Sequence, residues 1–405
     1  MTSKLPIQNI GETQQILPKQ AYTSPEWFQQ EVDKIFSRCW TFVGVRSEFE
    51  SPGDYISVQA GNHPLFAILD HQGEIKAYHN ICRHRGAKLL EGNGCSGKHI
   101  QCPYHRWVYK LNGDLRGVPN ESQLFGEVAR EELGLHKASI EIYRDLVFIH
   151  PDENPKESFS DWLAAIPDYS WPHEFKDLAK PDYQITYEMD CNWKVFYENA
   201  IDGYHLAYLH DKTLMDVKPP QQIWETVGQH HIWYKLDDDG SKHVGPDEMT
   251  KHMLEALQTE GVKDVFKAPV AGVYMLFPTT NFLPSSIGFS VGQIIPVAAD
   301  KTLVKTSTWF KSEIAHLEKD IIANMFPLPG IDLKPGEENR VSLNNISEHP
   351  LESGNFQIED MWVVEGIQQT MKSDRFKIGP LSYGAHGEGP LKEFQEFVLA
   401  ALNKA

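Results

Sequence analysis

The 405-residue chain has few cysteines, a deficit of positive charge and no long apolar run. Its five cysteines are an odd number spread thinly, which is unlike a disulfide framework and favours a reducing, cytoplasmic compartment. Lys and Arg number 38 against 56 Asp and Glu, and this net charge of -18 argues against nucleic acid as a partner, because phosphates would be repelled. No apolar run approaches the roughly 20 residues that span a bilayer, and we see no secretory signal, so we expect no membrane contact.

The remaining composition is that of an ordinary globular protein, with 41% hydrophobic and 23% charged residues. Short alternating runs between residues 54 and 150 are separated by turn dipeptides, which is typical of antiparallel strands and hairpins. The stretch PDENPKES (151–158) is rich in Pro and charge and suggests a boundary. We therefore expect an amino-terminal arm and helix over 1–37, a small β domain over 38–155 and a larger domain over 156–405.

Several helices are expected from capping residues and periodicity. Ser24 precedes a Pro and a broad apolar stripe over 24–40, and Asn192 can cap a helical run over 192–210. Further helices are expected over 245–261 and near 358–373, with longer strands between 270 and 310.

The stretch CRHRGAKLLEGNGCSGKHIQCPYHRW (82–107) supplies a Cys-x-His pair at one end and a Cys-x-x-His pair at the other. Thiolates and imidazoles bind zinc or iron–sulfur iron. A zinc finger usually has two cysteines at one end, whereas one Cys and one His from each end suits a two-iron cluster with both imidazoles on one iron. Such a cluster has a raised reduction potential. Zinc stays the alternative, and Cys95 and His99 are interpreted as spacer residues.

A second constellation lies in ENAIDGYHLAYLH (198–210), which offers Asp202, His205 and His210. The two histidines are five residues apart, about 140° on an ideal helix, so both can bind one metal only if the helix ends, kinks or bulges between them. Gly203 makes such a distortion cheap. Two imidazoles and one carboxylate are the ligands of non-haem Fe(II) oxygenases. Histidines used for packing or exposed on a surface are the alternative.

Together the two motifs resemble those of a known family. The first is similar to the Rieske [2Fe–2S] motif. The order of the two is similar to that in the catalytic α subunit of Rieske non-haem iron oxygenases, the ring-hydroxylating dioxygenases and related monooxygenases and demethylases. The resemblance runs from SPEWFQQEVDKIFSRCW (24–40) to GPLKEFQEFVLAAL (389–402). It implies an α+β fold, with a small all-β Rieske domain and a catalytic domain in which an antiparallel sheet grips long helices. Arg106 departs from the family, which usually has Gly there.

The resemblance also implies roles for individual residues. It implies the cluster ligands Cys82, His84, Cys102 and His105, and the iron ligands His205, His210 and an acid near the start of a late helix. In QIEDMWVVEGIQQ (357–369) we favour Asp360 as that acid, with Glu359 as the alternative. By the family's pattern Asp202 is a bridge that hydrogen-bonds to His205 and, across a subunit contact, to a cluster histidine. Asn199 is expected near the iron without binding it.

The function implied is that of a terminal oxygenase. It uses O2 and electrons relayed from NAD(P)H through a ferredoxin and/or flavin reductase to hydroxylate a small organic substrate, at an aromatic ring or an aliphatic C–H. The alternative is demethylation or hydroxylation of a quaternary ammonium compound. In this family a head-to-tail homotrimer, with or without a β subunit, brings one copy's His105 to the next copy's Asp202. No Gly-x-Gly-x-x-Gly follows a strand, so NAD(P)H binds another protein.

Charge and aromatic residues suggest further contacts. Residues 82–116 carry seven Lys or Arg against two acids, a charge of +5 that could steer an acidic donor. Five apolar residues are candidates for a substrate pocket, which a helix over 246–260 would cover, and most are equally good core residues: Tyr274, Met275, Phe277, Phe282 and Phe356. Two other classes stay open, an electron-transfer Rieske protein and a zinc-stabilised interaction protein. Iron content separates the three: three irons per chain for the oxygenase, two for the carrier and none for the zinc protein.

Overall fold

The computed structural model gives two compact units. It describes residues 14–126, 128–164, 166, 178–213, 222–236, 242–243, 273–284, 288–310, 327–334, 336–384 and 387–404. The small unit comprises 30–162 and 174–180, and the large unit comprises 1–29, 163–173 and 181–405. The helix expected over 245–261 lies outside the described residues, and the predicted domain boundaries at 38 and 156 stay predictions. Among the described residues, no helix combines the length and apolar character needed to cross a membrane.

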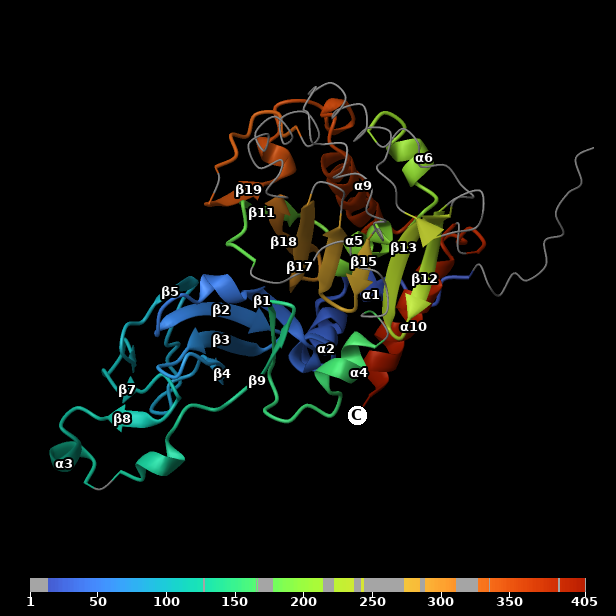
Figure 1. Cartoon of the computed structure of the whole chain (residues 1–405). Coiled ribbons are helices and arrows are strands. Elements are labelled where there is room, and N and C mark those ends of the chain that lie inside the picture. The colour runs from blue at the N-terminus through green and yellow to red at the C-terminus, as the bar shows by residue number, and fades with distance from the viewer. Residues whose placement is uncertain are drawn as a thin grey trace, which may run out of the picture. The chain divides into compact units, whose positions relative to one another are not determined.

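The small unit is built from three antiparallel sheets, with strand orders β1-β10-β9, β4-β3-β2-β5 and β6-β7-β8 (Figure 1). The strands are β1 (Thr41–Val45), β2 (Asp54–Ala60), β3 (His63–Leu69), β4 (Ile75–His79), β5 (Asn93–Cys95), β6 (Ile100–Gln101), β7 (Val108–Tyr109), β8 (Leu115–Gly117), β9 (Ser139–Tyr143) and β10 (Leu146–His150). The β2–β3 hairpin shows why they form. Ala60 pairs with His63, so Gly61 and Asn62 alone make the turn, and Gly61 takes the positive φ of 56° that such a turn requires.

Short helices flank these strands: α2 (Pro25–Lys34), η1 (Phe36–Arg38), η2 (Arg46–Glu48), α3 (Glu121–Leu124), η3 (Arg130–Glu132) and α4 (Phe159–Leu163). The Ser24 hydroxyl accepts a hydrogen bond from the Trp27 amide (3.1 Å), so Ser24 begins α2 as predicted. The helix expected over 24–40 ends at Lys34 and is followed by the single turn η1.

The large unit contains a nine-stranded sheet of order β12-β13-β15-β16-β17-β18-β11-β19, with β14 paired to β13. Only β11 and β19 pair in parallel among these described strands. The strands are β11 (Tyr183–Met189), β12 (Gln222–Val227), β13 (His230–Leu236), β14 (Lys242–His243), β15 (Tyr274–Leu276), β16 (Thr280–Pro284), β17 (Gly288–Ala298), β18 (Lys301–Phe310) and β19 (Glu338–Val341). The long strands expected between 270 and 310 are β17 and β18.

The helices of the large unit are α1 (Gln20–Thr23), α5 (Trp193–Ala200), α6 (Leu206–Leu209), η7 (Leu343–Asn345), η8 (Pro350–Glu352), α9 (Phe356–Met371) and α10 (Gly389–Asn403). Of these, α5, α9 and α10 pack against the sheet, and α1, η7 and η8 contact α9. The Tyr197 ring of α5 stacks on the Phe394 ring of α10, with centroids 4.3 Å apart. The Tyr197 hydroxyl donates to the Met275 carbonyl of β15 (3.2 Å). Asn192 accepts a hydrogen bond from the Lys194 amide (3.0 Å) and caps α5 as predicted. The small β domain and the antiparallel sheet with its helices confirm the predicted α+β fold.

Glu198 makes the large unit's stability depend on pH. Its buried carboxylate accepts hydrogen bonds from the Tyr22 hydroxyl (2.6 Å) and the Gln395 amide (3.0 Å). Burial raises the pKa of Glu198 from 4.5 to about 7, although these hydrogen bonds oppose the rise. A carboxyl with a raised folded pKa takes up a proton on folding. Its stabilising contribution is therefore full below about pH 4.5 and is lost as the pH rises through about 7.

We therefore expect Glu198→Gln to remove part of this pH dependence. Between about pH 5.5 and pH 8 the parent should lose roughly 2 kcal/mol more unfolding free energy than the variant does. Urea unfolding at the two pH values gives the change in unfolding free energy with pH for each protein. Any effect of the substitution that does not depend on pH cancels when these two changes are compared. Parallel pH dependence in the two proteins would contradict the raised pKa of Glu198.

Candidate metal centres

Two loops of the small unit, residues 82–87 and 102–107, have the same backbone hydrogen bonds. In each loop the cysteine N–H donates to the carbonyl five residues later (2.8 Å), and the N–H four residues later donates to the cysteine carbonyl (2.9 and 3.1 Å). That fourth residue has a positive φ in both loops, 73° at Gly86 and 58° at Arg106. Arg106 therefore occupies a position suited to glycine, at a cost on the order of 1 kcal/mol. The departure from the family at Arg106 keeps the loop geometry.

The four predicted cluster ligands converge between these loops. The Cys82 and Cys102 side chains are buried in the core of the unit, and His84 and His105 are partly exposed. The two Nδ1 atoms face each other 3.2 Å apart. Burial raises the pKa of the Cys82 thiol, so a bound metal must supply the positive charge that stabilises a thiolate there. Two buried sulfurs and two facing imidazole nitrogens fit a [2Fe–2S] cluster with mixed ligands.

Two further residues of this stretch, Cys95 and His99, are potential ligands by residue type. Cys95 is an exposed residue of β5, and His99 Nδ1 lies 3.3 Å from a guanidinium nitrogen of Arg116. These positions agree with the interpretation of both as spacer residues.

Tyr109 is a neighbour of the cluster site that the sequence did not indicate. Its hydroxyl lies 3.3 Å from Cys82 Sγ and accepts a hydrogen bond from the Arg83 amide (3.0 Å), which leaves the hydroxyl proton for the sulfur. Hydrogen bonds to cluster sulfurs influence the reduction potential, because they stabilise the more negative reduced state. Its position seven residues after Cys102 carries no sequence signal beyond an aromatic residue on a strand.

We expect Tyr109→Phe to lower the reduction potential of the cluster by about 20–60 mV, the one-electron equivalent of a hydrogen bond worth roughly 0.5–1.5 kcal/mol. A spectroscopic redox titration of the reconstituted protein measures the potential. Tyr104→Phe is the matched control, because that hydroxyl lies near Arg85 (3.4 Å). Equal potentials for Tyr109→Phe and the parent would contradict the hydrogen bond to sulfur.

The second constellation lies at the two ends of a single helical turn. α5 ends at Ala200, and α6 runs from Leu206 to Leu209, with His205 just before it and His210 just after it. The helical run predicted over 192–210 is thus divided before His205. The helix α6 ends between the two histidines, as the prediction required for both to bind one metal. The Asp202 carboxylate accepts a hydrogen bond from the Tyr204 amide (2.6 Å), and this local turn replaces the helix.

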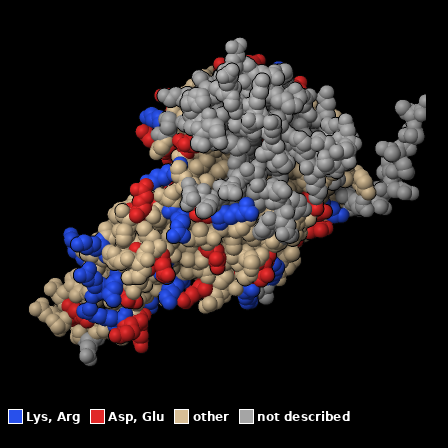
Figure 2. Space-filling model, in the orientation of Figure 1, with Lys and Arg blue, Asp and Glu red and all other residues tan. Residues whose placement is uncertain are grey.

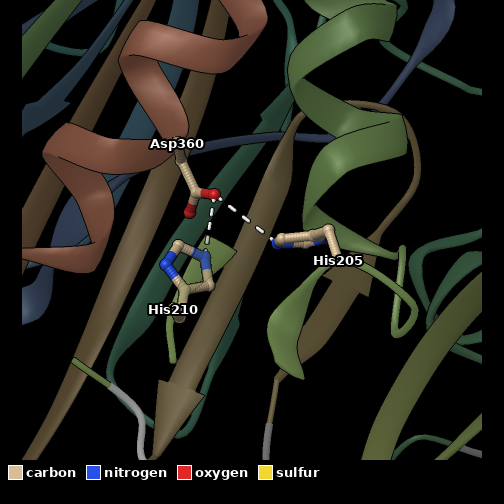
Figure 3. A group of neighbouring side chains, drawn as sticks. All are labelled: His205, His210 and Asp360. Atoms are coloured by element: carbon tan, nitrogen blue, oxygen red, sulfur yellow. Dashed lines mark hydrogen bonds and ion pairs between the residues drawn. The ribbon is translucent and has the colours of Figure 1, made fainter. Parts of the chain in front are cut away.

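His205, His210 and Asp360 form one compact group of potential metal ligands. One ligand atom from each lies within 4.8 Å of the others. Asp360 Oδ1 is 3.1 Å from His210 Nε2 and 3.5 Å from His205 Nε2 (Figure 3). Asp360 lies in the first turns of α9. The helix is capped by Asn355, whose side chain accepts hydrogen bonds from the backbone amides of residues 357 and 358. The structure therefore brings the acid of the late helix to both histidines.

Two further carboxylates lie on the outer sides of the imidazoles. Asp202 Oδ2 is 3.1 Å from His205 Nδ1. Glu359 Oε2 is 2.6 Å from His210 Nδ1 and accepts a hydrogen bond from the Thr213 hydroxyl (2.8 Å). Glu359 thus lies across the His210 ring from Asp360, which favours Asp360 over Glu359 as the third ligand. Glu359 and Thr213 were not predicted in this role.

The electrostatics of this group fit a bound cation. Burial alone would lower the pKa of His205, but Asp202 and Asp360 raise it to about 10. Burial alone would raise the pKa of Asp360, yet the two histidines hold it well below its usual range. Both ring nitrogens of His205 are buried and lie near a carboxylate, 3.1 Å from Asp202 and 3.5 Å from Asp360, without the alignment of a regular hydrogen bond. Two imidazoles and a carboxylate, with excess negative charge around them, match the ligands preferred by ferrous iron.

The remaining predicted residues divide between this site and the core. The Phe356 ring lies 6.0 Å from the His210 ring, edge to face. Phe277 packs among the rings of α5 and α10 as a core residue. Tyr274, Met275 and Phe282 are buried on β15 and β16 and stay predicted pocket residues, while the helix over 246–260 lies outside the described residues. The carbonyl of Asn199 accepts a hydrogen bond from the Asp202 amide (3.2 Å), and its place near the iron stays a prediction.

Comparison with known protein families supports both the cluster site and the iron site. Residues 39–136 match the Rieske [2Fe-2S] domain, and residues 175–404 match the catalytic domain of the ring hydroxylating alpha subunit. The chain belongs to the ring-hydroxylating alpha-subunit family. This membership confirms the predicted resemblance, and the two matched domains imply a Rieske cluster and a mononuclear iron. The donor sets described above fit both groups.

Several curated relatives are similar to this chain over part of its length. A terephthalate 1,2-dioxygenase terminal oxygenase subunit alpha 2 of Comamonas sp is 32% identical over 317 residues, which are 72% of this chain and 75% of that protein. A chloroplastic choline monooxygenase of Amaranthus tricolor is 32% identical over 199 residues, 48% of this chain. A glycine betaine monooxygenase oxygenase subunit of Pseudomonas aeruginosa is 30% identical over 198 residues. The chain spans only 44% and 45% of the lengths of the last two relatives.

Solved structures show the same fold. A quaternary ammonium Rieske monooxygenase in complex with L-carnitine superposes with a TM-score of 0.72 at 24% identity, and the match covers 96% of each chain. Naphthalene 1,2-dioxygenase with indole bound superposes with a TM-score of 0.68 at 22% identity, covering 95% of this chain and 92% of that one. At these identities the likeness concerns the fold.

Proposed function

We propose that the protein is the terminal oxygenase component of a Rieske non-haem iron system. The observation that carries this proposal is the convergence of His205, His210 and Asp360 in a chain that also holds a Cys/His-paired cluster site. Electrons from NAD(P)H arrive through a ferredoxin and/or flavin reductase, and O2 is the co-substrate. One oxygen atom or both are inserted into a small organic molecule.

The residues of the large unit have separate tasks in this proposal. His205, His210 and Asp360 would hold ferrous iron, which two imidazoles and one carboxylate suit. When bound, this iron supplies the redox chemistry that activates dioxygen. Asp202 and Glu359 lie at the two Nδ1 atoms and fix the tautomers that present Nε2 to the metal. Phe356 covers the His210 side of the site with an apolar ring.

Electrons are proposed to pass between copies of the chain in a head-to-tail trimer, the closed form of a heterologous contact. His105 of one copy would meet Asp202 of the next. Each residue lies beside exposed aromatic side chains within its own unit. Tyr104 is 57% exposed next to His105. Tyr204, whose amide donates to Asp202, is 48% exposed, and its ring contacts that of Tyr208. Exposed aromatic side chains of this kind are typical of interface anchors.

The first test is metal content together with oxygen consumption. We expect three irons per chain, a Rieske-type spin-resonance signal after reduction, and substrate-dependent oxygen uptake with NADH and a surrogate reductase. Two irons without oxygen uptake would indicate an electron-transfer protein instead. Zinc in place of iron would indicate the structural alternative.

The substrate class has two candidates. Hydroxylation of an aromatic or aliphatic carbon suits the apolar residues of β15 and β16 and the terephthalate dioxygenase relative. A quaternary ammonium compound is favoured by the choline and glycine betaine monooxygenase relatives, and aromatic side chains can hold such a cation through cation–π attraction. Oxygen uptake with terephthalate, choline and glycine betaine in parallel, followed by identification of products, separates the two candidates.

A further inference from the structure

The two histidines of the cluster site have different surroundings. The buried Trp107 ring lies parallel to the His84 ring, with centroids 4.9 Å apart and an interplanar angle of 8°. The Phe125 ring meets both of these rings edge to face, at 5.8 Å from His84 and 6.0 Å from Trp107. His105 instead contacts the exposed Tyr104 ring, at 3.7 Å. The cluster site therefore has two separate aromatic routes to the surface, one through each histidine.

The route through His84 ends in an exposed apolar surface. Leu124 is 69% exposed, the most exposed large apolar side chain in the part of the chain that the structure describes, and Phe125 beside it is 43% exposed. The backbone fixes this presentation, because Asn120 (φ 52°) and Gly126 (φ 71°) turn the chain on either side of α3. Two adjacent, ordered apolar side chains at a surface are costly to leave in water and suit a contact with another protein.

Basic residues lie to one side of the surface formed by Leu124 and Phe125. Figure 2 shows Lys and Arg gathered near β7 and β8 of the small unit, and residues 82–116 have a charge of +5 within a chain of -18. Arg130 links this region to α3, because it donates a hydrogen bond to the Arg116 carbonyl (2.7 Å) and pairs with Glu121. Glu131 and Glu132 follow on η3, so the charge changes sign across the surface. Such asymmetry favours one orientation of a charged partner.

We propose that Leu124 and Phe125, with the basic residues of 82–116, form the docking surface for a small acidic one-electron carrier protein of the ferredoxin class. This inference rests on the proposed function. It assigns the His84 side to the donor and leaves the His105 side for the neighbouring copy. One electron leaves the reduced donor, which becomes oxidised, and reduces the Rieske cluster. The transfer is favourable, since plant-type ferredoxins have lower reduction potentials than Rieske centres.

The test measures binding of oxidised plant-type [2Fe–2S] ferredoxin to the iron-loaded full chain by calorimetric titration. We expect Leu124→Ser and Phe125→Ser each to weaken the complex about tenfold, because each removes an apolar anchor. The matched control is Ile142→Ser, since Ile142 is an exposed apolar residue of β9 in the same unit. Raising the salt from about 50 to about 300 mM should weaken the parent complex as the basic residues are screened.

Three results would contradict the proposed docking surface. The proposal fails if the parent does not bind ferredoxin, or if both variants bind within about twofold of the parent. It fails equally if either variant lowers the oligomeric mass of the protein, since the surface then contacts a second copy. Phe125→Leu, which keeps an apolar side chain, supplies the binding result if Phe125→Ser does not fold, and should retain most of the affinity.

A chemical reductant separates this inference from the proposed function. Protein reduced with dithionite needs no docking, so the Leu124→Ser variant should form as much product in a single turnover as the parent. If the parent forms none from any substrate, the oxygenase proposal fails while the binding titration still decides the docking surface.

Discussion

Asp360→Ala is expected to empty the mononuclear iron site and to lower turnover by more than about 100-fold. Asp360 Oδ1 lies within reach of both imidazoles, and the two histidines hold the pKa of Asp360 well below its usual range. Replacing residues that only support a metal ligand typically costs 10–100-fold in metal affinity or activity, so removing the carboxylate ligand itself should cost more. The iron content should fall from three to two per chain. The Rieske spin-resonance signal should stay intact, because the ligands of the cluster lie in the other unit.

Glu359→Gln is the matched control for this experiment, because Glu359 is the neighbouring acid on the same helix. The Glu359 carboxylate contacts the opposite nitrogen of His210 and the Thr213 hydroxyl. A glutamine can keep one oxygen at His210 Nδ1 but loses the charge, so we expect iron affinity to fall about 10–100-fold while the site still fills at high iron. Loss of iron in Glu359→Gln with retention in Asp360→Ala would reverse the assignment of ligands.

The cluster site was predictable from the sequence because each half of it is local. Cys82 and His84 share one loop, and Cys102 and His105 share the other, so their spacing alone brings each pair together. The structure adds what spacing does not contain. Residues four positions after each cysteine have positive φ, and this explains why Arg106 can replace a glycine only at some cost in backbone energy.

The iron site was less predictable because its parts are far apart in the chain. Asp360 lies 150 residues after His210, so no local pattern relates the two, and only the resemblance to a family indicated the acid. The run expected over 192–210 is divided because the Asp202 carboxylate accepts the Tyr204 amide and forms a turn between α5 and α6, which an Asp-Gly pair often indicates. The good helix formers Leu206, Ala207 and Leu209 form α6 after this turn.

Asp202→Asn is expected to leave both metal sites filled and to lower turnover by at least about 100-fold. The Asp202 carboxylate has two contacts in this chain. Oδ1 accepts the Tyr204 amide (2.6 Å) and holds the loop, and Oδ2 lies 3.1 Å from His205 Nδ1. Asparagine keeps an oxygen for Tyr204, but it lacks the negative charge that, in the proposed trimer, would lie between His205 and the neighbouring copy's His105. Asp202→Ala should have the same effect on turnover, with an additional loss of stability because the loop contact disappears.

Single-turnover kinetics of the reduced enzyme tests the bridge directly. In the Asp202→Asn variant, cluster oxidation in the presence of substrate and O2 should slow by the same factor as turnover, while the cluster's reduction potential and the iron content stay at parental values. Asp211→Asn is the matched control, since Asp211 is an exposed acid beside His210 with the same charge. A parental rate of cluster oxidation in Asp202→Asn would show that electrons reach the iron without this carboxylate. The path between copies would then have to run through another contact, with the exposed Tyr204 and Tyr208 the next residues to replace.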